Sequence, residues 1–202
     1  MPDSLSRIPG QRLTGTETFR GNGIPQGATI GHFWQWSASD LLGNTSRGVL
    51  AEYLVALALS VDVSGTRDGW SPFDLRTPEG VTVQVKSAAF VQSWHQRRLS
   101  TIAFNVQPTR AWDPGTNTVA DHPQRHANVY VFALLAHDDK SSVDPLDVSQ
   151  WRFFVLPTHM LDERTRSQHS ITLRSLRSLA GEGVSFNGLR SAVQKAAGGG
   201  VV

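Results

Sequence analysis

Alternating apolar and polar positions predict a β-hairpin in the stretch Trp70 to Ala88. Side chains alternate in character from Phe73 to Thr77 and again from Val81 to Lys86, which is the period of a half-buried strand. Between the two arms stands Pro78-Glu79-Gly80, where proline presets a negative φ and glycine accepts a positive one. We therefore expect two short antiparallel strands joined by a tight turn.

The register of this hairpin predicts a cluster of polar side chains. With three residues in the loop, Thr77 lies opposite Val81, so Asp74 lies opposite Gln84 and Lys86 follows two residues along the same face. Directly opposed residues have Cβ atoms roughly 5 Å apart. This polar face is the candidate active site.

A helix is predicted before the hairpin, from Thr45 or Ser46 as its cap to about Val61. Its apolar residues at helical spacing are Val49, Leu50, Tyr53, Leu54 and Leu57, and the remaining positions are so apolar that burial nearly all round is expected. Glu52 is the one acid inside this helix. Because a buried carboxylate needs a cation or donors, Glu52 either turns toward a metal, pairs with an arginine such as Arg47, or reaches solvent.

Later strands are predicted at Ser100–Val106, Asn128–Ala136 and Trp151–Leu156. The run Asn128–Ala136 is almost continuously apolar, as in a central strand covered on both faces. Thr158 is expected to cap a short helix, and two further helical pieces follow. This order favours an α/β fold with a mixed central sheet flanked by helices.

The expected organisation is an irregular N-terminal arm over residues 1–31, one domain over residues 32–196, and a disordered tail over residues 197–202. Ser37 to Asp40 is predicted to cap a short helix. The aromatic residues Phe33, Trp34 and Trp36 form either a buried patch or a base-stacking surface, and burial is favoured.

Composition narrows the class of protein. A chain of 202 residues with 39% hydrophobic residues can bury a core without staples, and the absence of cysteine excludes disulfides and thiolate zinc sites. The N-terminal sequence has no signal-peptide pattern and no apolar run reaches membrane-spanning length, so we expect a cytoplasmic protein without membrane contact. A formal charge of +2 and a pI of about 9.4 permit a nucleic-acid partner.

The hairpin motif resembles the PD-(D/E)xK nuclease superfamily, whose restriction-endonuclease-like core carries an Asp on one strand and Glu-x-Lys on the next. Here the matching residues are Asp74 and Gln84-Val85-Lys86, and Glu52 stands where the superfamily often has a helical Glu. The string KSAAFVQSW also resembles bacterial members of the superfamily, which usually have Glu at the position of Gln84. The expected fold is therefore a restriction-endonuclease-like mixed sheet.

The resemblance implies a Mg²⁺-dependent DNA endonuclease, with Mn²⁺ able to substitute and no organic cofactor. By resemblance, Asp74 is the principal metal ligand, and the side chain of Gln84, the backbone carbonyl of Val85 and Glu52 complete the set. Lys86 would orient the attacking water and stabilise developing charge. Such an enzyme would act in restriction, phage defence or repair, as a homodimer if it cuts both strands of a duplex.

Gln84 keeps an oxygen for coordination but removes one negative charge from the site. A Gln-x-Lys enzyme that still cleaves, a natural loss of activity and an altered residue are all compatible with the sequence. A second hypothesis is therefore a nuclease-like module that binds nucleic acid without cutting it. The plainest alternative is a surface hairpin with a weak cross-strand ion pair between Asp74 and Lys86.

Nucleic-acid contacts are predicted after the hairpin and in the long connection that follows. The candidates are Gln92, Trp94, Arg97, Arg98 and Arg125, although a packed Trp94, a solvent-facing Gln92 and a merely exposed Arg125 are simpler interpretations.

Two other polar groups invite a metal interpretation. His122 and His126 have the spacing of helical zinc ligands, but Pro123 separates them and no third ligand is evident. Asp138 and Asp139 are better explained as a charged turn that ends a strand.

Overall fold

The computed structural model describes residues 5–165 and 167–198. Its strands are β1 (Thr18–Gly21), β2 (Ile24–Thr29), β3 (Leu75–Arg76), β4 (Thr82–Ala89), β5 (Ala103–Asn105), β6 (Trp112–Asp113), β7 (Thr118–Val119), β8 (Val129–Leu135), β9 (Trp151–Pro157) and β10 (Ser170–Thr172). Its α-helices are α1 (Ile30–Ala38), α2 (Asn44–Ala58), α3 (Thr158–Asp162), α4 (Leu173–Ala180) and α5 (Leu189–Gly198), with short 3₁₀ turns at Val148–Gln150 and Phe186–Gly188.

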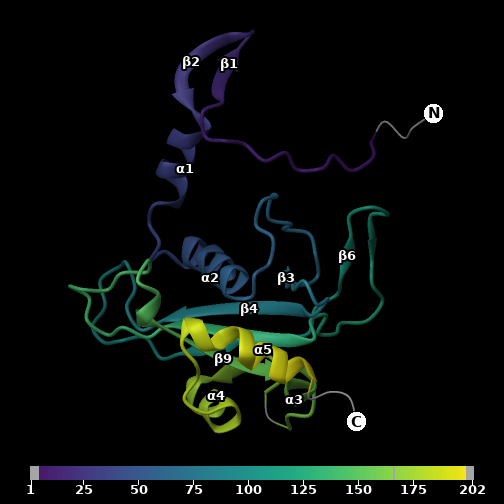
Figure 1. Cartoon of the computed structure of the whole chain (residues 1–202), viewed down its shortest axis with the longest axis vertical. Helices are drawn as coiled ribbons and strands as arrows, with labels where there is room; N and C mark the ends of the chain where they lie inside the picture. The colour runs from purple at the N-terminus through teal and green to yellow at the C-terminus, as the bar shows by residue number, and fades with distance from the viewer. Residues whose placement is uncertain (1–4, 166, 199–202) are drawn as a thin grey trace.

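A four-stranded mixed sheet in the order β3-β4-β8-β9 lies at the centre of the molecule (Figure 1). The pairs β3–β4 and β8–β9 are antiparallel, whereas β4 and β8 are parallel. Every residue of β8 is buried, because this strand has neighbours on both edges and side-chain layers on both faces. The prediction of a mixed α/β sheet with a central strand here is confirmed.

Two apolar layers cover the two faces of the sheet. Val83 and Val85 of β4 point into the layer formed with α2 and α5, together with alternate residues of β8 and β9. Tyr130 and Phe132 of β8 point into the other layer, which contains residues of α3, α4 and the small β5–β10 sheet. Gln84 and Lys86 alternate with the two valines, so they belong to the second side of β4.

The predicted hairpin is present with the predicted register. Leu75 pairs with Val83 and Arg76 pairs with Thr82. The same register places Thr77 opposite Val81, and the Thr77 N–H donates to the Val81 carbonyl at 2.9 Å. Gly80 ends the turn with φ of 89°, a conformation that suits glycine. The first strand is shorter than expected, since β3 contains two residues only.

The segment before α2 differs from the prediction of an irregular arm. Residues 18–29 form the β1–β2 hairpin, and α1 follows directly, capped by Thr29 in a reciprocal capping box with His32. Figure 1 shows the hairpin and α1 projecting away from the central sheet, and no residue of α1 is buried. Ser37 and Ala38 are the last residues of α1 and Ser39 is its C-cap, so the segment from Ser37 to Asp40 ends a helix and does not begin one.

The expected burial of the aromatic residues in this segment was also wrong. Phe33, Trp34 and Trp36 are 44%, 42% and 84% exposed, because α1 packs only lightly against its surroundings.

The helix before the hairpin is present, but it is not buried all round. It begins at Asn44 with Gly43 at the N-cap position, so Thr45 and Ser46 lie inside its first turn. Its buried residues are Arg47, Ala51, Leu54, Val55 and Ala56, whereas Val49, Tyr53 and Leu57 are 43–49% exposed. Because this helix is apolar on nearly every side, its periodicity did not determine which side faces the sheet.

The C-terminal third follows the predicted order of strand and helices. Thr158 begins α3 but does not cap it, since its hydroxyl donates to the carbonyl of Ala127 at 2.5 Å and Pro157 holds the N-cap position. Helix α5 extends to Gly198, and the remainder of the predicted disordered tail, residues 199–202, lies outside the described residues. Among the helices of the described ranges, none has the length and apolar character required to cross a bilayer.

Candidate active site

The β3–β4 hairpin holds Asp74 against Gln84 and Val85. The Asp74 N–H donates to the Val83 carbonyl at 3.1 Å, which continues the strand ladder and fixes the backbone of Asp74. Its carboxylate then accepts the Val85 N–H at 2.7 Å and a hydrogen bond from the Gln84 side-chain amide. The cross-strand proximity of Asp74 and Gln84 that the sequence predicts is present.

The Asp74 carboxyl is an unusually weak acid in this environment. Its pKa is raised to about 6, mainly by burial and in smaller part by the negative charge of Glu52. The hydrogen bond from Val85 and the positive charges of Lys86 and Arg67 act in the opposite direction without overcoming burial. Asp74 and Glu52 are therefore close enough to repel each other, and two cationic side chains lie within electrostatic reach.

Glu52 enters this cluster from α2 and is paired with Arg67. The Arg67 Nε and Nη2 atoms donate to the two carboxylate oxygens of Glu52 at 2.5 and 2.8 Å, a two-pronged arrangement that suits guanidinium and carboxylate. The Glu52 side chain is 15% exposed and that of Arg67 is 48% exposed. The helical acid is thus compensated by a cation, but that cation comes from the loop after α2.

Arg47, the partner considered from the sequence, lies elsewhere. It is buried and donates to the Leu42 carbonyl at 2.7 Å, to Gln92 at 3.1 Å and to Asn44 at 2.7 Å. Burial lowers the pKa of this guanidinium. Arg47 therefore ties α2 to the segment after β4 and takes no part in the Asp74 cluster.

Lys86 lies on the same side of β4 as Gln84, as the alternation of the strand requires. Among the described residues, no ion pair within 4.0 Å joins it to Asp74, so the simple cross-strand ion pair is absent. Its charge still lowers the pKa of Asp74, which places the ammonium group within the field of the site.

The donor atoms at this site fit a hard divalent cation. Asp74 and Glu52 offer carboxylate oxygens, and Gln84 and the Val85 backbone offer neutral oxygens, which are the ligands that Mg²⁺ prefers. The mutual repulsion of the two carboxylates would be relieved by a dication between them. No group of three or more His, Cys, Asp or Glu side chains suited to a metal occurs in the described ranges, but Mg²⁺ commonly uses only one or two carboxylates.

A cavity of about 420 Å³ opens beside Asp74 and Gln84. Its other walls come from the loop before β3, including Trp70 and Pro72, and from residues 109–112, including Arg110 and Trp112. Arg110 is exposed and forms no ion pair with the described residues. The site is therefore accessible to a ligand and has a cationic wall.

The family model of bacteriophage T4 endonuclease IV matches residues 34–175, which is more than half of the 202-residue chain. The chain belongs to the bacteriophage T4 endonuclease IV family. This membership supports a nuclease function. The comparison with curated proteins gives no match.

The region matched by the endonuclease IV family contains every residue of the Asp74 cluster, from Glu52 on α2 to Lys86 on β4, and both segments that line the adjoining cavity. The β1–β2 hairpin and α5 lie outside it. The candidate site is therefore located in the part of the chain that carries the family relationship.

Gln92, predicted to contact nucleic acid, is buried within this endonuclease IV-like region. It is 6% exposed, and its side chain bonds to Arg47, to the Ala89 carbonyl and to Ser100. A side chain with these internal partners is not accessible to a nucleic acid. The prediction for Gln92 was wrong because the sequence did not reveal its pairing with Arg47.

Trp94, Arg97 and Arg98 lie on the exposed loop that follows β4. Trp94 is 52% exposed, so it is not the packed side chain of the simpler interpretation. Because Gln84 lies near the start of β4, the loop begins about 16 Å further along the strand. Contact of Trp94, Arg97 and Arg98 with nucleic acid stays a prediction. It would involve a part of the bound strand that lies away from Asp74 and Gln84.

The side chain of Arg125 is buried and bonded to other parts of the protein. Its side chain is 1% exposed and donates to the Val106 carbonyl at 2.9 Å, to Asp162 at 2.5 Å and to Gln168 at 2.8 Å. These bonds join the long connection to α3 and to the segment before β10. They leave no exposed guanidinium, so the prediction of a phosphate contact at Arg125 was wrong.

The weaker metal candidates do not form sites. The His126 ring is engaged with the Thr109 carbonyl at 2.8 Å and His122 is exposed, with no cluster of three ligands in the described ranges. Asp139 accepts bonds from Ser141 and Ser142, which is the turn that the simpler interpretation predicts.

Sequence reasoning missed the contributions of Arg67, Arg110 and Trp112. All three lie on segments outside the long strands and helices, where no periodic pattern marks a residue as inward-facing. The one signal that could have pointed to Arg67 is the need of the buried Glu52 for a cation, because Arg67 is a basic residue close to the hairpin in the sequence.

Proposed function

We propose that this member of the endonuclease IV family is a Mg²⁺-dependent DNA endonuclease that uses a PD-(D/E)xK-type site with Gln-x-Lys in place of Glu-x-Lys. The observation that carries the proposal is the buried carboxyl of Asp74, with its pKa of about 6, held beside Glu52, Gln84 and Lys86. A carboxyl kept at this energetic cost, next to an open cavity, indicates a site selected for chemistry and not for stability.

Mg²⁺ would supply a positive centre beside the scissile phosphate and lower the pKa of a water molecule. Asp74 would hold it as principal ligand, with the Val85 carbonyl, the Gln84 side chain and Glu52 as the other protein ligands. Gln84 presents its amide nitrogen to Asp74, and rotation of that amide by half a turn would present oxygen to the metal instead.

The protein side chains would do the remaining work on the phosphodiester. Lys86 would orient the attacking water by donating a hydrogen bond to its oxygen, and the positive charge of Lys86 would stabilise the negative charge that develops on the phosphate. Arg110, on the opposite wall of the cavity, would bind a phosphate of the same strand. Arg67 would hold Glu52 in place until the metal competes for it.

The experiment is cleavage of plasmid DNA by the purified protein with Mg²⁺ or Mn²⁺, compared with Lys86→Ala and Gln84→Glu. Cleavage by the wild-type protein is expected to be lost in Lys86→Ala and to require less metal in Gln84→Glu, because the added carboxylate strengthens metal binding. Circular dichroism provides the control that each variant is folded. Cleavage that survives in Lys86→Ala would exclude this site as the catalytic centre.

A second candidate is a module that binds nucleic acid without cutting it. It is favoured by the fact that both carboxylates already have protein partners, Glu52 with Arg67 and Asp74 with Gln84. Salt-dependent DNA binding with no cleavage by the wild-type protein or by Gln84→Glu would support this function.

Action on both strands of a duplex would require a homodimer, which size-exclusion chromatography with and without DNA would detect. A role in restriction, phage defence or repair in the cytoplasm is part of the same proposal.

A further inference from the structure

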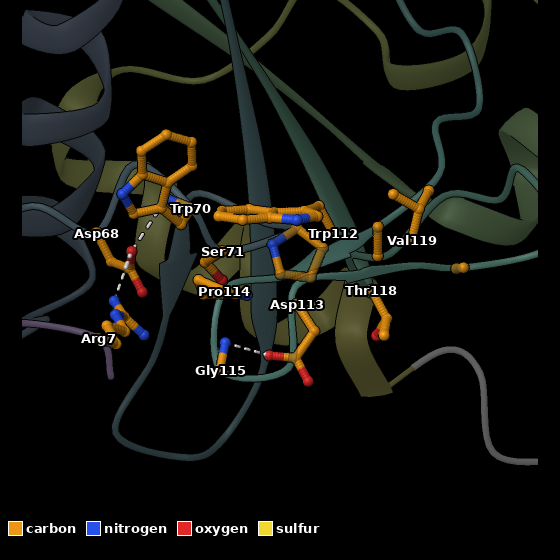
Figure 2. A pocket seen from close by; sticks show the side chains of 13 residues that line it. Arg7, Asp68, Trp70, Ser71, Trp112, Asp113, Pro114, Gly115, Thr118 and Val119 are labelled. Carbon is orange, nitrogen blue, oxygen red and sulfur yellow. Dashed lines mark hydrogen bonds and ion pairs between the residues drawn. The ribbon is translucent and has the colours of Figure 1, made fainter. Parts of the chain in front are cut away.

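A second cavity adjoins the Asp74 site and is lined by two tryptophans (Figure 2). It has a volume of about 520 Å³, within the range of about 300–1,000 Å³ that is usual for small-ligand pockets. The two cavities share Trp70, Ser71, Pro72, Ala111 and Trp112, so a ligand can extend from one into the other.

Trp70 and Trp112 meet edge to face, with ring centroids 4.9 Å apart and an interplanar angle of 64°. They come from different parts of the chain, the loop before β3 and the strand β6, and Figure 2 shows the two indoles next to each other above the polar residues of the pocket. Part of one indole face is consequently left without a protein partner, since Trp70 is 62% exposed.

The tryptophans are held by a polar frame. Arg7 pairs with Asp68 at 3.4 Å, and Asp68 also accepts the backbone N–H of Trp70 at 3.0 Å. The Trp112 indole N–H donates to Asn117 at 3.2 Å across the β6–β7 hairpin. The indole of Trp112 is therefore held by its own N–H, and that of Trp70 by its backbone position and by its contact with Trp112, so the aromatic surface is present without a ligand.

A purely structural role for the pair would be to fasten the β6–β7 hairpin to the loop before β3. That role requires the edge contact but leaves unexplained why the larger part of the Trp70 side chain faces solvent, where an apolar surface is costly. An exposed indole beside the proposed nuclease site is well suited to stack on a nucleobase, since every base has an aromatic face.

We infer that Trp70 and Trp112 form a stacking site for one nucleobase of the substrate strand, adjacent to the metal site proposed at Asp74. This inference rests on the proposed nuclease function and names the part of the substrate that the site recognises. The Arg110 guanidinium, on the wall shared with Asp74, would bind the phosphate that joins the stacked nucleotide to its neighbour.

The test compares two single-stranded oligonucleotides of about 12 nucleotides, one normal and one in which every base is replaced by an abasic sugar. The two carry the same number of phosphates, so the electrostatic contribution to binding is the same. Fluorescence anisotropy measured in EDTA, where no metal-dependent cleavage occurs, gives both affinities. The wild-type protein is expected to bind the normal strand about 5- to 100-fold more tightly than the abasic strand.

In Trp70→Ala and Trp112→Ala this preference should fall at least several-fold, whereas affinity for the abasic strand should be unchanged. The unchanged abasic affinity also shows that the variant is folded. Trp70→Phe should keep most of the preference, because a phenyl ring still stacks. Leu146→Ala, which removes another exposed apolar side chain away from both cavities, should keep all of it.

A wild-type preference that persists in both alanine variants would overturn the inference, as would equal wild-type affinity for the two strands. Failure of the proposed function is a different result. In that case the wild-type protein would show the Trp70-dependent preference for bases and yet fail to cleave DNA with Mg²⁺.

Discussion

Replacement of Asp74 by asparagine should stabilise the folded protein. The pKa of Asp74 is raised from 3.8 to about 6 on folding, mainly by burial and then by Glu52. The folded state therefore binds a proton more tightly than the unfolded state does. The free energy of unfolding therefore falls as pH rises from about 4, because Asp74 must ionise in a buried position. This fall levels off once the pH is well above the folded pKa of about 6.

The magnitude follows from the shift. A difference of about two pKa units at 1.36 kcal/mol each corresponds to roughly 3 kcal/mol, which is the upper limit of the gain expected for Asp74→Asn at pH 8. Asparagine is neutral at every pH and retains an oxygen that can accept the Val85 N–H. The gain should therefore shrink toward zero at about pH 4, where Asp74 is protonated in the folded protein.

Urea denaturation of the wild-type protein and of Asp74→Asn between about pH 4 and pH 8 measures this difference. Asp121→Asn, a change at an exposed loop residue, is the matched control and should alter stability by less than about 0.5 kcal/mol. With saturating MgCl₂ the wild-type protein should recover stability and the variant should not. A stability difference between wild type and Asp74→Asn that is the same at every pH would refute the reasoning.

Three further outcomes are expected. Arg67→Met should tighten Mn²⁺ binding in calorimetry, because the guanidinium no longer competes for Glu52, and unchanged affinity would exclude Glu52 as a ligand. Arg47→Ala should lower the free energy of unfolding by about 2–4 kcal/mol in urea titrations, since it leaves buried acceptors unpaired, and a loss below about 1 kcal/mol would contradict that account. Arg125→Ala should cost a similar amount for the same reason while DNA affinity is retained, and a selective loss of DNA affinity would restore its predicted role.

The elements best predicted from the sequence are those defined by local chemistry. The turn at Gly80 fixed the hairpin register, and with it the approach of Asp74 to Gln84, because a period of two leaves one choice of face. The strand β8 could be assigned because a continuous apolar run is compatible with burial on both faces.

Other features depend on tertiary partners that periodicity does not reveal. Helix α2 presents apolar residues on every side, so the side that packs on the sheet is chosen by small residues such as Ala51 and by the buried Arg47. Likewise, the pairing of Glu52 with Arg67 depends on the path of an aperiodic loop. A sequence pattern marks which residues are polar, but it does not show which polar residues meet across loops.

The parallel pairing of β4 with β8 has a kinetic consequence. Thr82 and Asn128, which hydrogen-bond where this ladder begins, are 46 residues apart, so the chain must close a long loop before the central sheet exists. The β3–β4 hairpin is local and can form early, but burial of its carboxyl awaits the arrival of β8. During refolding, catalytic competence should consequently appear with the slow phase and not with the first secondary structure, so partly folded chains would leave nucleic acid intact.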